Sequence, residues 1–286
     1  MNYALLKIRS RYILKEISEH LNQKKLLQII RYNKQLRRRL EKRLEDYRKA
    51  YSKTVIEIEP VENICGKIIN YININKSYYH IYFNDSEEEI NRNIITQEDK
   101  VHKIKIIIDY EIKSFYNLFH KIKTLKKVNF IKFTNNDIYN MNRMFNNCSS
   151  LEEINFSNFN TDKVKDMSNM FRECSSLKKL NLNKFNTTNV TNMCGMFYGC
   201  SSLENLNLST FNTKKVSDMS GMFYNCSSLK ELNLLNFKNT DKTIFEFIFV
   251  GCSSLKELKC EEKPLNIEYE RLNNNFYGFK FFVGNK

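Results

Sequence analysis

The sequence MFRECSSLKKLNLNKFNTTNVTNMCG, residues 170–195, decides the fold, because closely similar strings begin again at Met196 and at Met222. A fixed period between 20 and 50 residues is typical of proteins built from stacked repeats. The period here is 26 residues, and five cysteines mark it: Cys148, Cys174, Cys200, Cys226 and Cys252. Five full units and one weaker copy, in which Ile122 takes the cysteine position, run from Leu118 to Cys260.

Each unit contains two patterns that predict different local structure. The L-x-x-L-x-L segment, such as Leu177, Leu180 and Leu182, ends in an alternation of period two, which favours a short strand with one buried face. Upstream, Val190, Met193, Met196 and Phe197 follow a spacing that predicts one or two helical turns with an apolar face. A unit of 26 residues cannot bury both faces alone, so we expect neighbouring coils to stack into a solenoid.

These strings resemble leucine-rich repeats, and most closely the BspA-like branch, whose units read MF-x-x-CSSL-x-x-LNL-x-x-FNT-x-x-V-x-DMS. The resemblance covers about half of the chain. It implies an α/β solenoid, a right-handed array of coils, with a helical N-terminal module and a small β-rich cap. It also implies a protein that binds other proteins rather than an enzyme.

The rest of the chain divides by composition. We predict a basic helical module at 1–50, a β-rich N-terminal cap at 51–117, the leucine-rich repeat solenoid at 118–260 and an aromatic C-terminal cap at 261–286. The cap at 51–117 is indicated by alternating apolar residues, as at Val55, Ile56 and Ile58. It would protect the first coil from pairing with other chains.

The net charge of +14 is concentrated at the N-terminus, where residues 1–53 hold 16 Lys and Arg against 5 Asp and Glu. Two amphipathic helices are expected between residues 10 and 40. Their arrangement resembles a degenerate F-box, a module that docks on a Skp-type ubiquitin-ligase adaptor, although the Leu-Pro opening and the later Trp of that module are absent. Alternatives are a plain helical cap and a basic surface for nucleic acid or anionic lipid. If the chain binds nucleic acid, we expect one basic cluster to contact it: Arg37, Arg38, Arg39, Lys42 and Arg43.

Catalytic chemistry finds little support in the composition. Seven Gly and four scattered His, with neither a C-x-x-C nor an H-E-x-x-H motif, predict no enzyme activity, no cofactor and no metal site. The five periodic cysteines are expected to be reduced, buried thiols, because a column of five cannot pair fully. No run of about 18 apolar residues and no apolar signal segment is found, so a cytoplasmic location is expected; the family resemblance also allows a surface location.

The candidate binding surface follows from the strand pattern. If the leucines of L-x-L point inward, the residues between and before them point outward in two columns along the coils. One column is mostly Asn and the other varies from coil to coil, so the varied column is the better candidate for specificity. The twelve candidates are Lys127, Asn129, Glu153, Asn155, Lys179, Asn181, Asn205, Asn207, Glu231, Asn233, Glu257 and Lys259. An alternative is that the Asn column only hydrogen-bonds along the ladder.

Overall fold

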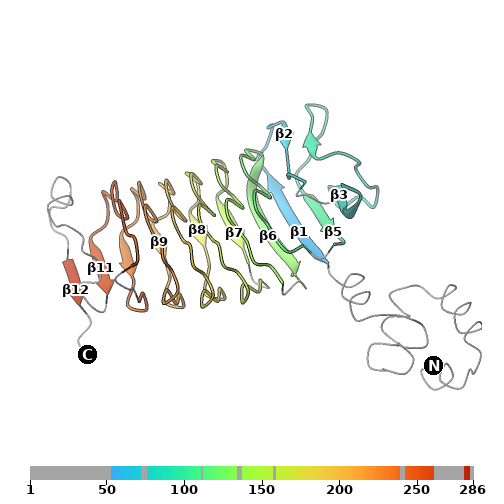
Figure 1. Cartoon of the computed structure of the whole chain (residues 1–286). Helices are drawn as coiled ribbons and strands as arrows, with labels where there is room; N and C mark the ends of the chain where they lie inside the picture. Colours follow the sequence, from blue (N-terminus) through green and yellow to red (C-terminus); the bar gives the residue numbers. More distant parts are fainter. Residues whose placement is uncertain are drawn as a thin grey trace, which may run out of the picture.

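Each repeat forms one coil, and consecutive coils stack side by side into an elongated body (Figure 1). The structure is a computed structural model that describes residues 53–71, 76–110, 112–133, 137–156, 159–238, 242–260 and 280–283. The predicted helices at residues 10–40, with the F-box resemblance and the basic cluster, lie outside the described residues. Of the predicted C-terminal cap, only 280–283 is described.

The coils contribute short parallel strands to one side of the stack. They are β6 (Leu125–Phe133), β7 (Glu153–Asn155), β8 (Lys179–Leu180), β9 (Asn205–Leu206), β10 (Glu231–Asn233) and β11 (Glu257–Cys260), followed by β12 (Lys280–Val283). Equivalent repeat positions are register partners, as in the pairs Lys127–Glu153 and Glu153–Lys179. The 26-residue period therefore sets the register of the parallel ladder, and the predicted short strands are confirmed.

The segment before the repeats adds antiparallel strands to the first coil. These are β1 (Thr54–Pro60), β3 (Tyr79–Phe83) and β5 (Ile104–Ile108), and the sheet has the order β3-β5-β1-β6-β7-β8. A small pair, β2 (Gly66–Lys67) and β4 (Ile94–Ile95), lies beside it. The alternating isoleucines of β1 and β5 are buried, since one face of this sheet covers the same core as the repeats.

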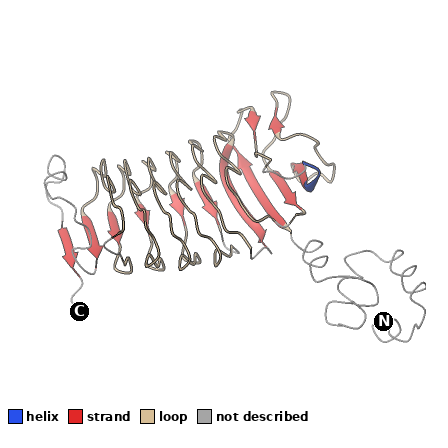
Figure 2. Cartoon of the chain, in the orientation of Figure 1, coloured by secondary structure: helices blue, strands red, loops and turns tan. Residues whose placement is uncertain are grey.

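The prediction of helical turns in each coil is wrong. Among the described residues the assigned helix is the short η1 (Lys76–Tyr78), and the coils consist of strands and turns (Figure 2). In the segment after Val190, alternate N–H groups donate to the next coil, as Met193 does to the Asp218 carbonyl and Phe197 to the Met222 carbonyl, both at 2.9 Å. An α-helix would use every N–H within its own chain segment, so bonding between coils replaces it.

These turns need a left-handed residue at two positions in every coil. The first column holds Asn117, Arg143, Asn169, Gly195, Gly221 and Phe247, and the second holds Lys121, Asn147, Glu173, Gly199, Asn225 and Gly251, all with φ between 54° and 79°. Glycine and asparagine tolerate this conformation best. Their frequency at these positions follows from the turn geometry.

The core between the strand side and the turn side is a set of continuous columns. The periodic Leu, Met, Phe and Cys residues are buried. One phenylalanine column stacks with ring centroids 5.1 to 5.9 Å apart and planes within 12°: Phe119, Phe145, Phe171, Phe197, Phe223 and Phe249. Each coil completes the core of its neighbours, which is why a single unit is too small to fold alone.

Candidate functional site

The twelve candidate residues lie on the strand side of the coils, and none of them is buried. Between them the inward residues of the strands are buried at Val128, Ile154, Leu206, Leu232 and Leu258. The strand registers place Asn129 beside Asn155, Asn205 beside Glu231 and Glu231 beside Glu257. We call the twelve residues the strand face.

At the N-terminal end of the strand face, lysines of β6 form ion pairs with a glutamate of β1. Glu59 accepts from Lys127 at 2.8 Å and lies 3.1 Å from the Lys126 ammonium. Hydrogen bonds from these two lysines lower the pKa of Glu59, and the same pair raises the pKa of Lys127. Sequence reasoning missed Glu59, because antiparallel pairing of β1 with β6 is independent of the repeat period.

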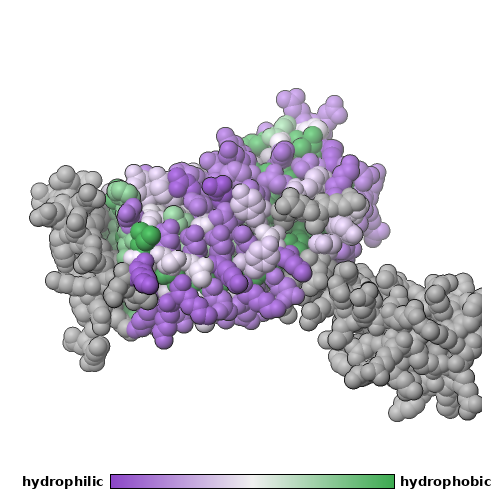
Figure 3. Space-filling view, in the orientation of Figure 1, coloured by the Kyte–Doolittle hydropathy of each residue, from purple (hydrophilic) through white to green (hydrophobic). Residues whose placement is uncertain are grey.

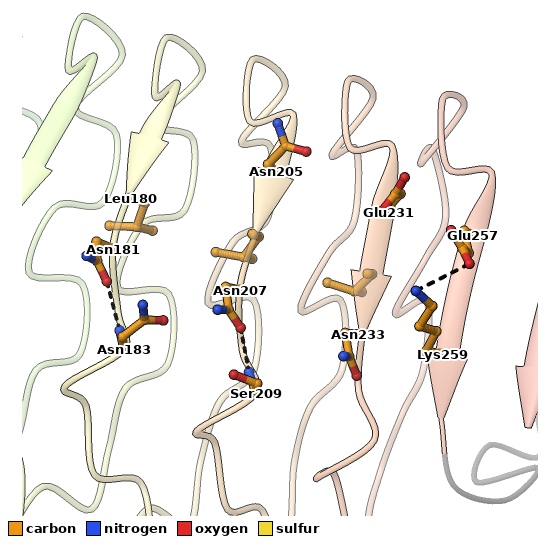
Figure 4. A pocket seen from close by; sticks show the side chains of 12 residues that line it. Leu180, Asn181, Asn183, Asn205, Asn207, Ser209, Glu231, Asn233, Glu257 and Lys259 are labelled. Atoms are coloured by element: carbon orange, nitrogen blue, oxygen red, sulfur yellow. Dashed lines mark hydrogen bonds and ion pairs between the residues drawn. The ribbon is translucent and has the colours of Figure 1, made fainter. Parts of the chain in front are cut away.

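The C-terminal part of the strand face is hollowed instead. A depression of about 540 Å³ crosses β8 to β11 (Figure 4). Seven of the twelve candidates line it: Asn181, Asn205, Asn207, Glu231, Asn233, Glu257 and Lys259. Leu180, Leu206 and Leu232 contribute apolar surface, and Asn183 and Ser209 complete the rim.

The asparagines of the Asn column cap their own strands rather than one another. The side-chain oxygens of Asn181, Asn207 and Asn233 accept the backbone N–H two residues later, at 3.0, 3.0 and 3.1 Å. This is a local turn motif that ends a strand. The predicted amide ladder is therefore not the arrangement at these three residues, and their amide nitrogens face away from the capped backbone.

The depression lies where the strand ladder opens. Glu152 donates to the Lys126 carbonyl at 2.8 Å and Lys178 to the Glu152 carbonyl at 2.9 Å, but in this fully described stretch Glu204 makes no such bond to Lys178. No strand pairing among the described residues joins β8 to β9. The turn side stays bonded across the same junction, as from Phe171 to the Met196 carbonyl at 2.9 Å. Leu180 is consequently only partly buried.

A second depression, of about 800 Å³, lies on the turn side. Its wall is the stacked pair Tyr198 and Tyr224, with ring centroids 4.5 Å apart, and the Arg172 guanidinium lies 3.7 Å from the Tyr198 ring centroid. Phe247, 57% exposed, lies at one end. Sequence reasoning missed this site, although Tyr198 and Tyr224 are 26 residues apart and occupy one repeat position.

Cys65, Cys194 and the five periodic cysteines are free thiols. Burial raises the pKa of all five periodic thiols, to about 12 for Cys174 and Cys252. Burial also raises the pKa of Cys194, which lines the second depression, and Asp218 adds to that effect. These groups are protonated near neutral pH and are poor nucleophiles.

The described residues contain no cluster of three or more His, Cys, Asp or Glu arranged to hold a metal ion. No helix in the described parts has the length and apolar character needed to cross a membrane. The visible face of the molecule is mostly hydrophilic, with small apolar patches (Figure 3).

Comparisons with known proteins found one family and one solved structure similar to parts of the chain. Residues 113–237 match the model of a family described as "Mycoplasma protein of unknown function, DUF285". No curated protein matches the chain. Among solved structures, a T. pallidum leucine-rich repeat protein is similar, with 18% identity over 60% of this chain and 79% of the other, and a TM-score of 0.36. The 26-residue period and the stacked coils make the chain a repeat protein, and over residues 113–237 it is similar to a family whose function is unknown.

Proposed function

We propose that this chain is a non-catalytic repeat protein that binds another protein through its strand face. The observation that carries the proposal is the alignment of outward side chains from consecutive coils, with a depression across β8 to β11 that seven of them line. Laterally continuous faces of this kind are the surfaces that repeat proteins commonly use for binding.

The side chains of the depression suit recognition by hydrogen bonds. They offer amides, a hydroxyl, the carboxylates of Glu231 and Glu257, and the Lys259 ammonium, which lies 3.4 Å from Glu257. The varied outward column of the strand face changes its side chain from coil to coil, from Lys179 through Asn205 to Glu231. Such variation at fixed spacing allows one partner to be distinguished from another.

The test is affinity capture from cells of the source organism with three forms of the full chain. Asn207→Arg places a long cationic side chain in the depression. Thr191→Arg introduces the same side chain at an exposed residue outside the strand face. We expect wild type and Thr191→Arg to retain the same protein and Asn207→Arg to lose it. Equal retention by all three forms would overturn the proposal.

A further inference from the structure

We propose that the depression across β8 to β11 binds an extended protein segment that carries a lysine or arginine side chain, with its cationic group at Glu231. The proposal rests on the proposed function and deepens it, because it names one part of the strand face and one class of partner.

Two glutamates lie side by side on adjacent strands. Glu231 and Glu257 are register partners of β10 and β11, and like charges directly beside each other destabilise a sheet. Lys259 lies 3.4 Å from Glu257 and forms an ion pair with it, so Glu257 already has a cation partner. Within the described part of the chain, no ion pair is formed by Glu231, although it is exposed and lines the depression. A cation from a partner would remove this repulsion.

Several charges in and beside the strand face are matched by ion pairs within the described residues, whereas Glu231 is not. Lys127 is paired with Glu59 at 2.8 Å, and beside the depression Glu204 is paired with Lys230 at 2.5 Å. Lys179, on β8, does not line the depression, and the charged residues that do are Glu231, Glu257 and Lys259. Glu257 is paired with Lys259, so Glu231 is the group left to attract a cation from a ligand.

The opened ladder supplies an apolar contact at β8. Leu180 is partly buried, whereas the equivalent Ile154, Leu206 and Leu232 are buried, because the bond that would close β9 onto β8 is missing from these described coils. Because β8 and β9 are not paired, Leu180 and Glu231 are farther apart than two strand spacings, about 9.6 Å. Covering that distance takes about three or more residues of extended chain. An apolar side chain near Leu180 and a basic one at Glu231 would then be about three or more residues apart.

The amides favour a peptide over a simple cation. Since the side-chain oxygens of Asn181 and Asn207 accept the backbone N–H groups of Asn183 and Ser209, their NH₂ groups point away from those two N–H groups (Figure 4). Those NH₂ groups are donors. An extended segment has carbonyl groups that its own chain leaves unbonded, and these can accept from the two amides.

The experiment uses a phage-displayed library of random 12-residue peptides panned against the full chain. Enriched peptides are synthesised with a fluorescent label and titrated by anisotropy against wild type, Glu231→Gln and the control Glu246→Gln, an exposed glutamate outside the strand face. We expect enriched peptides to be rich in Lys or Arg. Glu231→Gln should weaken them by about tenfold or more, and Glu246→Gln should leave them unchanged. Thermal unfolding of Glu231→Gln should occur at or above the wild-type temperature, since a like-charge contact is removed.

The outcomes separate this inference from the proposed function. Peptides without basic enrichment, or equal binding by wild type and Glu231→Gln, overturn the inference. If such peptides are still lost with Asn207→Arg, the strand face remains a protein-binding surface. If no peptide is enriched, or if Asn207→Arg also has no effect, both proposals fail. Spermine binding as tightly as the best peptide would show a site for small cations and would overturn the choice of a protein segment.

Discussion

The Cys200 thiol donates a hydrogen bond to the backbone carbonyl of Phe171, 3.1 Å away on the preceding coil. The same bond joins Cys148 to Phe119, Cys174 to Phe145, Cys226 to Phe197 and Cys252 to Phe223, each at 2.9 to 3.1 Å. The cysteine of each repeat is thus a buried link between coils. This explains why a residue that is both small and apolar, yet able to donate, fits that position.

Replacing one such thiol should destabilise the whole stack. Cys200→Ala removes a buried side chain and its hydrogen bond, and we expect a loss of about 1–2 kcal/mol in the free energy of unfolding. Urea denaturation of full-length protein measures this loss. Cys65→Ala is the control, because Cys65 is exposed and should change stability by less than about 0.5 kcal/mol. Equal effects of the two changes would contradict the link between coils.

The raised thiol pKa values make stability fall at high pH. A group whose pKa is higher in the folded state stabilises the fold fully below its ordinary pKa, near 9 for cysteine, and loses that contribution as pH rises toward the folded value, about 12 for Cys174. By pH 10.5, one such thiol should contribute about 2 kcal/mol less to the free energy of unfolding than it does below pH 9. Cys174→Ala should therefore reduce the drop in stability between pH 9 and 10.5. An unchanged drop would show that this thiol does not contribute.

The threonine of the FNT string is a second side chain that links neighbouring coils. Buried Thr187 donates to the Asn212 carbonyl at 3.0 Å and accepts from the Asn212 N–H at 2.7 Å. Thr187→Val keeps the shape but leaves both backbone groups without their partner, at an expected cost of about 2–4 kcal/mol. Exposed Thr188 offers the same change as a control, with little effect expected. Chemical denaturation of both variants checks the difference.

Two glycines test the left-handed turns. Gly195 and Gly221 have φ of 59° and 60°, so alanine at either position should cost about 1 kcal/mol from backbone conformation. A Cβ at Gly195 would also lie 2.8 Å from the Asn169 side-chain oxygen, whereas at Gly221 the nearest atom is 3.5 Å away. Gly195→Ala should therefore lower the melting temperature more than Gly221→Ala. The reverse order would contradict the turn geometry.

The period of 26 residues was enough to predict the parallel register, the buried columns and the outward direction of Asn181 and Glu231. It was not enough to predict the turns, because spacing alone does not distinguish a helix from a turn whose N–H groups bond to the next coil. The ion pair of Glu59 with Lys127 depends on a strand outside the repeats. The opening beside Leu180 depends on one missing bond between nearly identical coils, for which the sequence has no signal.

The most direct test of the central claim is site-specific photo-cross-linking to the captured partner. A benzophenone side chain is introduced singly at Asn181, Asn207 and Asn233 on the strand face, and at Thr191 and Ser217 outside it. Binding through the strand face predicts covalent adducts from the first three positions and none from the other two. Adducts from Thr191 and Ser217 alone would contradict it.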